Sequence, residues 1–233
     1  MSLALVKRGR GPLDRSRQAA PQILETLRTR ILSLELTPNT LISRAGLQAE
    51  FGVSQTPLRD ALMKLDEEGL VEVYPQHATV VARIDLTTAR QAHFLRLAVE
   101  LEALRRIVPS ADAALTARLE LHLARQREAQ ESGDRAAFEE ADFDFHAAFY
   151  DAAAVPELWH LVRRQSGHID RLRRLNLPIP GKIEAILADH AAILEAIRRR
   201  DAEAATEALR RHLSGTLSII DDIRARYPNY LVE

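Results

Sequence analysis

Four side chains in the second half of the sequence are of the types, and at the spacings, that bind a divalent metal ion. Asp142 and His146 are four residues apart, so on a helix both project from the same face, about one turn apart. His190 and His212 lie on opposite sides of a tight turn expected at residues 200–201. At ~1.5 Å per residue both histidines lie ~15 Å from that turn, so an antiparallel helix pair places their imidazoles level with each other.

The four side chains converge inside a helical bundle if the helix that carries Asp142 packs against this pair. One carboxylate and three imidazoles suit Zn²⁺, with Ni²⁺, Mn²⁺ and Fe²⁺ as alternatives, and they leave coordination positions open for water or a ligand. Taken singly, each histidine is more commonly an ordinary core or surface residue that forms hydrogen bonds. The antiparallel register is the feature that groups them into a predicted metal site.

The composition restricts the classes of protein to which the chain can belong. With 233 residues, 46% of them hydrophobic, it can form one large or two modest domains, and only 9 Gly and 10 Pro favour long helices. A net charge of −1 means that any surface for nucleic acid is local. The absence of cysteine excludes disulfides, thiolate catalysis and Cys-ligated zinc. No apolar stretch approaches about 18 residues, so we expect a cytoplasmic protein without a membrane partner.

A change in composition near residue 83 divides the chain. Residues 1–17 carry basic side chains beside Gly and Pro without an apolar period, which predicts a flexible basic arm. Residues 1–83 carry 11 Lys and Arg against 9 Asp and Glu, whereas residues 84–233 are rich in alanine. We therefore predict a small first domain over residues 18–83 and a longer helical second domain over residues 84–233.

The first domain has the pattern of a winged helix-turn-helix. Apolar residues at helical spacing predict three helices, over residues 21–36, 44–51 and 54–68. Gly52 can end the second helix in the left-handed conformation, Ser54 can cap the third, and Pro57 lies early in the third, where a missing N–H costs nothing. β-branched residues on either side of residues 74–77 then predict a two-stranded hairpin.

The third of these helices has a polar face suited to duplex DNA. Apolar residues between Leu58 and Leu65 should pack inward, and the N-terminal part of such a helix can meet base edges in the major groove. Arg59 can contact guanine with two hydrogen bonds, and Gln55 can contact adenine or a phosphate. The alternative is a small helical domain with an ordinary polar face. The predicted DNA-contacting residues are Arg44, Ser54, Gln55, Thr56, Arg59, Lys64 and His77.

The second domain is predicted to be helical throughout. The helix boundaries are marked by Asp, Gly and Pro residues. The predicted helices cover residues 86–108, 112–131, 135–151, 156–177, 182–200 and 202–226. The fold class is therefore mainly α, a winged helix-turn-helix followed by an all-α bundle of six or seven helices.

The DNA-binding half resembles a known family. The stretch GVSQTPLRDAL at residues 52–62, followed by EGLV at 68–71, is similar to the DNA-binding domain of the GntR family of bacterial transcription regulators. Family members usually have Arg at the position of Gln55 and Gly at the wing tip, where this chain has His77. We therefore expect operator sequence and affinity to differ from the family norm.

The second half resembles the C-terminal ligand-binding domain of the FadR-type branch of that family, called FCD. The similarity lies in residues 142–146, 189–197 and 201–213. In many members of this branch the Asp and three His at these positions hold a metal. The resemblance thus implies a metal site formed by Asp142, His146, His190 and His212.

The same resemblance implies an effector cavity. Arg96 and Glu100 fall in the Arg-x-x-Val-Glu pattern that opens an FCD domain, where the arginine points into the cavity and can bind a carboxylate. A solvated arginine on a helix face is the alternative. His168 is a further candidate for the lining of this cavity, so the expected effector-binding residues are Arg96, Glu100 and His168.

We therefore expect a homodimeric transcription regulator rather than an enzyme. It should act as a repressor on a double-stranded DNA operator, controlled by a small carboxylate effector at a divalent metal ion in the second domain. One alternative is an all-helical metal-dependent hydrolase or lyase that uses a metal-bound water. Against it, no second carboxylate or lysine has the spacing of a general acid or base, and no Gly-rich phosphate loop is present. A helical adaptor without DNA or metal is the other alternative.

Overall fold

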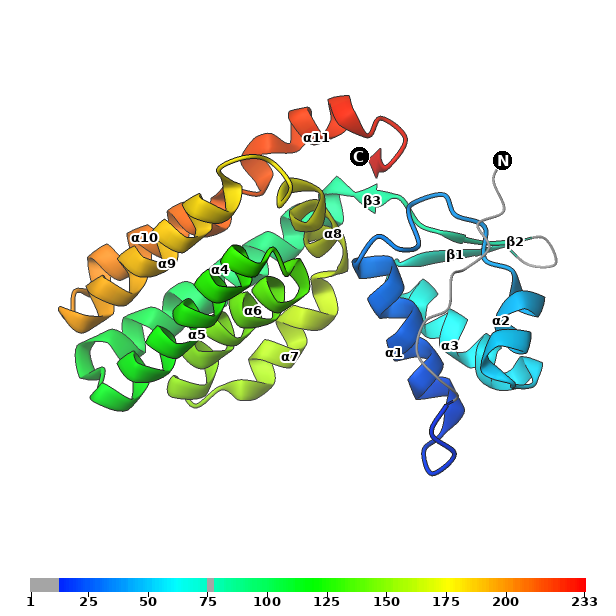
Figure 1. Cartoon of the computed structure of the whole chain (residues 1–233), viewed down its shortest axis with the longest axis horizontal. Helices are drawn as coiled ribbons and strands as arrows, with labels where there is room; N and C mark the ends of the chain where they lie inside the picture. The colour runs from blue at the N-terminus through cyan, green and yellow to red at the C-terminus, as the bar shows by residue number, and fades with distance from the viewer. Residues whose placement is uncertain (1–12, 75–77) are drawn as a thin grey trace. The chain divides into compact units, whose positions relative to one another are not determined.

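The computed structural model describes residues 13–74 and 78–233, which form two compact units. Unit 1 contains the described residues up to Ala89 together with Gly167–Arg174 and Asp221–Glu233. Unit 2 contains Arg90–Ser166 and Leu175–Ile220 (Figure 1). The N-terminal unit is therefore completed by two segments that lie far from it in the sequence.

Unit 1 contains the winged helix-turn-helix that the sequence pattern predicts. It consists of α1 (Ala19–Leu32), α2 (Arg44–Phe51), α3 (Gln55–Glu67), β1 (Val71–Tyr74) and β2 (Ala78–Val81). The two strands pair antiparallel, with Val71 opposite Val81. Helix α1 ends at Leu32 rather than at the predicted Leu36, because Leu34 has a φ of 61° and cannot continue a right-handed helix.

The core of unit 1 lies between α1 and α3. Ile23, Leu27 and Ile31 of α1 are fully buried, as are Leu58 and Leu65 of α3. Burial of each such side chain contributes about 1.5–3 kcal/mol. Since α3 packs through this apolar face, its opposite, polar face is left on the surface.

The first of the described residues are held by a buried glutamine. Residues 1–12 of the expected basic arm lie outside the described residues. Asp14 and Arg17 form a turn, and the Gln22 side chain bonds the backbone N–H and C=O of Asp14 and the C=O of Arg17. The described end of the arm is therefore attached to α1.

A second, two-stranded sheet joins the end of the chain to the segment after the wing. Strand β3 (Ile84–Asp85) runs parallel to β4 (Leu231–Val232), and the Ile84 N–H donates to the Tyr230 carbonyl at 2.7 Å. Two-residue strands have no measurable period, so the sequence pattern did not predict them. Packing thus assigns these strands to unit 1, although they follow residue 83 in the chain.

Two of the predicted helices are each divided in the structure. The helix predicted over 156–177 is α7 (Pro156–Gln165) followed by α8 (Gly167–Asn176). The helix predicted over 202–226 is α10 (Ala202–Ser214) and, after a short 3₁₀ turn, α11 (Ile220–Arg226). Both breaks fall at a Ser-Gly pair, a dipeptide that favours turns. The sequence predicted continuous helices because the apolar period continues on both sides of each pair.

Unit 2 is a helical bundle, and the predicted mainly-α fold is confirmed. Its helices are α4 (Leu86–Ile107), which begins in unit 1, α5 (Ala113–Ser132), α6 (Arg135–Ala152), α7, α9 (Lys182–Arg198) and α10. The side chains of Asp112, Asp134 and Asp201 accept backbone N–H groups at the starts of α5, α6 and α10, each contributing ~1 kcal/mol. Among the described residues, no helix is long and apolar enough to cross a membrane.

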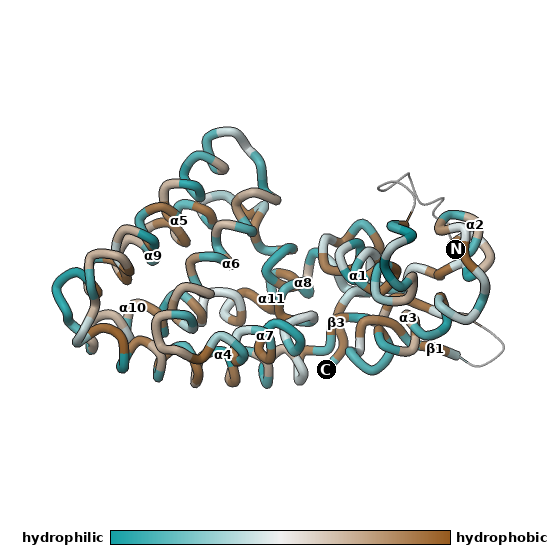
Figure 2. Tube along the Cα trace, turned by 90° about the horizontal axis from the view of Figure 1, so that it is seen from below, coloured by the Kyte–Doolittle hydropathy of each residue, from teal (hydrophilic) through white to brown (hydrophobic). Residues whose placement is uncertain are grey.

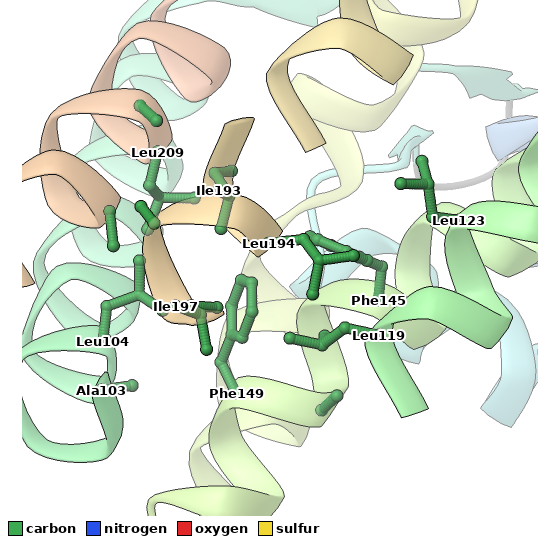
Figure 3. Close-up of a cluster of buried hydrophobic side chains, with 14 of the residues drawn as sticks. Ala103, Leu104, Leu119, Leu123, Phe145, Phe149, Ile193, Leu194, Ile197 and Leu209 are labelled. Atoms are coloured by element: carbon green, nitrogen blue, oxygen red, sulfur yellow. The ribbon is translucent and has the colours of Figure 1, made fainter. Parts of the chain in front are cut away.

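The core of unit 2 is built from five helices whose apolar side chains point toward one another. Leu104 of α4, Leu119 of α5, Phe149 of α6, Ile193 of α9 and Leu209 of α10 are all fully buried (Figure 3). Apolar and polar residues alternate along these helices, so each buries one face (Figure 2). The polar cluster described next lies on helices that also form this core.

Candidate metal centre and nucleic-acid interface

Three helices bring the four predicted metal ligands together inside unit 2. Asp142 and His146 come from α6, His190 from α9 and His212 from α10, and one donor atom of each lies within 4.8 Å of the others. The His212 Nε2 atom is 3.2 Å from the Nε2 atoms of both His146 and His190. The His190 Nε2 atom is 3.7 Å from Asp142 Oδ1. All four residues selected from spacing therefore meet at one point.

The cluster is buried, and aromatic rings orient it. Asp142, His146 and His190 are at most 1% exposed, and His212 is 9% exposed. The ring of Phe145 stacks on His190 with centroids 4.2 Å apart and an interplanar angle of 13°. A polar cluster removed from water to this degree requires partners for its nitrogen and oxygen atoms.

The donor set fits a divalent cation. An imidazole nitrogen carries either one proton or one lone pair, so His212 Nε2 can make only one of its two 3.2 Å contacts as a good hydrogen bond. The Nε2 lone pair of the other histidine and the Asp142 carboxylate, both of which accept hydrogen bonds, then lie within 4.8 Å of each other. A cation at the centre satisfies all of these atoms at once, and neutral imidazole and carboxylate are ligands that Zn²⁺ and similar ions accept.

The outer nitrogen of each imidazole faces a second polar side chain. His146 Nδ1 is 2.7 Å from Glu100 Oε2 of α4, and His190 Nδ1 is 2.8 Å from Gln126 Oε1 of α5. His212 Nδ1 is 3.8 Å from the nearer oxygen of Asp189, which is beyond hydrogen-bond distance. The centre therefore depends on five helices, three that supply ligands and two that supply their partners.

Burial keeps the His146 imidazole neutral, and neighbouring charges keep Glu100 ionised. Burial alone would raise the pKa of Glu100, but the adjacent Arg96 and His146 outweigh it and lower that pKa to about 2. Burial lowers the pKa of His146 to about 4, although Glu100 opposes the shift. A neutral imidazole with an available lone pair is the form that binds metals.

Arg96, one of the residues expected to bind the effector, lies beside the cluster. Its Nε donates to Glu100 Oε1 at 2.7 Å, and burial, which alone would lower the pKa of Arg96, is outweighed by Glu100 and Asp142, which raise it. Its Nη2 is buried and has no hydrogen-bond partner among the described residues. Glu100 was expected in the same role, but its two oxygens are engaged by Arg96, Tyr150 and His146.

His168, which was expected to line the effector cavity, has partners within unit 1. His168 belongs to unit 1, where its Nδ1 accepts the Asp85 backbone N–H at 2.8 Å. Burial and the neighbouring Arg171 lower the pKa of His168 to about 4. Helix α8 begins at the break after α7, and its residues Gly167–Arg174 pack with unit 1 rather than with the bundle that contains Arg96.

Gln126 is a site residue that the sequence reasoning missed. It is fully buried, and besides His190 it contacts the Ala141 carbonyl, to which its Nε2 donates at 3.2 Å. The available signal was a glutamine three residues after the buried Leu123, on the apolar face of α5. A polar residue at such a position needs a specific partner.

The predicted nucleic-acid surface lies on α3 of unit 1. Gln55, Thr56 and Arg59 are exposed, and Arg59 has no ion pair among the described residues. Ser54 occupies the N-cap position, but within the described chain its side chain makes no cap hydrogen bond, so the hydroxyl is available for other contacts. The predicted polar face is thus present at the start of the helix.

The other predicted DNA contacts have partners within unit 1 or lie outside its described residues. The Arg44 guanidinium donates to Thr79 Oγ1 from Nη2 at 2.8 Å and from Nε at 3.1 Å, which attaches α2 to the wing strand β2. Lys64 pairs with Glu67 at 2.8 Å on the exposed surface. His77 falls within residues 75–77, which the structure does not describe.

Comparison with known proteins supplies two family matches and several relatives. Residues 91–215 match the FCD domain, and residues 19–81 match the bacterial regulatory proteins of the gntR family. An uncharacterized HTH-type transcriptional regulator in an unstable DNA locus of Streptomyces ambofaciens is 36% identical, covering 87% of this chain and 85% of that protein. The HTH-type transcriptional repressor RspR of Escherichia coli K12 is 29% identical over 91% and 93% of the two chains. The structure of E. coli McbR/YncC shares the fold, with a TM-score of 0.73 at 20% identity over 88% and 98%.

Proposed function

The chain belongs to the GntR family of bacterial transcription regulators and carries an FCD domain, and from this we propose that it is a repressor controlled by a small carboxylate at a metal centre in unit 2. It is a DNA-binding regulator, and its families and relatives are not enzymes, which decides against the hydrolase or lyase alternative. The repressor sign is supported by the name of the similar E. coli protein RspR.

The observation that carries the proposal is the convergence of three imidazole nitrogens and one carboxylate in the bundle interior. Asp142, His146, His190 and His212 would hold the ion, Zn²⁺ in the first place, with Ni²⁺, Mn²⁺ or Fe²⁺ as alternatives. When bound, the ion supplies open coordination positions that a carboxylate oxygen can occupy. Three imidazole ligands and one carboxylate would leave a divalent ion with excess positive charge, which favours an anionic effector.

Arg96 is the residue best placed to recognise that anion. Its Nη2 is buried next to the cluster without a partner among the described residues, and a guanidinium already oriented by Glu100 can donate to a carboxylate without rearranging. An effector that touches Arg96 and the metal ligands contacts α4, α6, α9 and α10 together. Its binding can therefore favour one setting of these helices over another, which is what regulation requires.

On the DNA side we propose a homodimer that places two α3 helices on a pseudo-palindromic operator. Helix-turn-helix regulators of this kind read two half-sites related by the two-fold axis of the protein. Gln55, Thr56 and Arg59 would meet base edges, and Arg44, Ser54, Lys64 and His77 would complete the contact surface. Effector binding would lower operator affinity and relieve repression.

The test combines metal analysis with DNA binding. Untagged protein should contain about one divalent ion per chain by mass spectrometry, and Asp142→Asn should lose it. The matched control is Asp144→Asn on the same helix, since Asp144 is 46% exposed and faces Arg125. Gel shifts with the DNA upstream of the gene should show binding that selected carboxylates weaken only in metal-loaded protein. Metal-free wild-type protein after mild purification, or equal loss in both variants, would overturn the metal site.

A further inference from the structure

Two of the three imidazoles in the cluster contact a buried polar side chain through Nδ1, the ring nitrogen that faces away from the cluster. Glu100 comes from α4 and Gln126 from α5, so neither lies on a helix that supplies a predicted ligand. Both are fully buried. Their contacts to Nδ1 of His146 and of His190 determine which ring nitrogen of each histidine carries the proton.

The orientation of the Gln126 amide follows from its two neighbours. The Ala141 carbonyl can only accept a hydrogen bond, so the amide group facing it at 3.2 Å must be the NH₂ donor. The amide oxygen therefore faces His190 Nδ1 at 2.8 Å and can only accept. His190 must carry its proton on Nδ1, which leaves the Nε2 lone pair directed at Asp142 and His212.

The same reasoning applies to Glu100. Its Oε1 accepts from Arg96 Nε at 2.7 Å and from the Tyr150 hydroxyl at 3.3 Å, so the ion pair keeps the carboxylate charged and unable to donate. Its Oε2, 2.7 Å from His146 Nδ1, must therefore accept a hydrogen bond from an N–H at that position. His146 thus also presents a bare Nε2 to the centre.

We propose that Glu100 and Gln126 are positioning residues that hold His146 and His190 in the Nδ1–H tautomer and thereby set the affinity of the centre for a divalent cation. This inference rests on the proposed metal site and assigns to Glu100 a role different from effector binding. Partners of this kind usually change metal affinity by about 10–100-fold when removed. They act by fixing the ring orientation and the nitrogen that donates to the metal.

The third imidazole is not held in this way. The nearer oxygen of Asp189 is 3.8 Å from His212 Nδ1, and Asp189 also accepts a hydrogen bond from Arg211 Nε at 3.0 Å. Asp189 is partly exposed, so water can replace either contact. Asp189→Asn is therefore a matched comparison. It is a change of the same chemical kind next to His212, whose tautomer the Asp189 contact does not determine.

The wild-type protein tests the tautomers without any variant. In ¹⁵N-histidine NMR spectra of chelator-treated protein, His146 and His190 should each show a protonated Nδ1 and an unprotonated Nε2. Either residue found with its proton on Nε2 would overturn the assignment. This measurement needs neither metal nor DNA.

Zn²⁺ affinity, measured by competition with a chromophoric chelator, tests the consequence. In Glu100→Gln, Arg96 and Tyr150 hold the new amide oxygen, so the amide NH₂ faces His146 and moves its proton to Nε2. We expect the affinity to fall about 10–100-fold in Glu100→Gln and Gln126→Met, whereas Gln126→Glu, which keeps the acceptor, should retain most of it. Asp189→Asn should change it by less than either.

The outcomes separate this inference from the proposed function. If wild-type protein binds Zn²⁺ and both Glu100→Gln and Gln126→Met bind it equally well, the positioning role is wrong and the metal site stands. If the NMR tautomers are as expected but wild-type protein binds no divalent ion, the metal site is wrong. Circular dichroism confirms that each variant keeps its helices, and a variant that unfolds leaves the wild-type NMR result to decide the tautomer assignment.

Discussion

His168 on α8 accepts, through Nδ1, a hydrogen bond from the backbone N–H of Asp85 in β3, 2.8 Å away. Three residues later on α8, Arg171 donates from Nη1 to the carbonyl of Ala82 at 2.6 Å. Both side chains are buried, so polar contacts as well as apolar ones attach this helix to the strand after the wing. The DNA-binding unit therefore contains a segment encoded in the middle of the FCD sequence.

The first prediction is that stability falls between about pH 6.5 and pH 4 because of His168. The pKa of His168 is lowered from 6.5 to about 4 by burial and by Arg171, with Asp85 and the Gly69 backbone opposing. Below pH 6.5, His168 binds a proton in the unfolded chain but not in the folded chain. The contribution of His168 to the free energy of unfolding is therefore fully present above pH 6.5 and is lost as the pH falls toward 4. The loss attributable to this residue is about 3 kcal/mol.

Urea unfolding at a series of pH values checks this prediction. His168→Asn, whose side-chain oxygen can still accept from Asp85, should show a shallower pH dependence than wild type over the same range. A parallel pH dependence in the two proteins would show that other groups, such as His146, account for the effect.

Arg171 should be required for the stability of unit 1. It is fully buried, and burial lowers its pKa to about 10. Arg171→Met keeps the bulk but leaves the Ala82 carbonyl without its donor, which should cost about 1–3 kcal/mol in chemical denaturation. Arg164→Met, at an exposed position on α7, is the control and should lie within about 0.5 kcal/mol of wild type.

Arg59 should contribute to operator affinity. It is exposed on the polar face of α3, and loss of a two-hydrogen-bond contact to guanine should cost about 1–3 kcal/mol and relax specificity at one base pair. Fluorescence anisotropy at fixed salt measures the change. Arg127→Ala, an exposed arginine of unit 2, removes the same charge and should bind the operator as wild type does. Equal affinity for Arg59→Ala would remove this residue from base recognition.

Zn²⁺ should stabilise the folded protein. An ion that binds only the native state adds about 2.7 kcal/mol at a hundredfold excess over its Kd, which raises the melting temperature by several degrees. Excess chelator should reverse the rise, and His190→Ala should abolish it because His190 lies at the centre of the cluster. A melting temperature that rises equally in His190→Ala would place the stabilising ion elsewhere.

Features that depend on neighbouring residues could be predicted from the sequence. The apolar periods of α2 and α3, the left-handed Gly52, and the caps Asp134 and Asp201 each depend on residues within one or two helical turns. The meeting of His190 with His212 also follows from local geometry, since two helices joined by a tight turn place residues at equal distances from that turn side by side. Rigid helical spacing carries such information across a hairpin.

Only the tertiary structure decided which residues contact the outer nitrogens of the predicted ligands, and to which unit the segments of the divided helices are assigned. Glu100 and Gln126 lie 46 and 64 residues from the histidines they contact, and nothing in a local pattern relates positions so far apart. Likewise, residues 167–174 have an amphipathic pattern that would suit either unit. The hydrogen bonds of His168 and Arg171 with backbone groups of Asp85 and Ala82 place this segment in unit 1. The helical period determines which face of a helix is buried. The packing of the whole chain determines which element that face packs against.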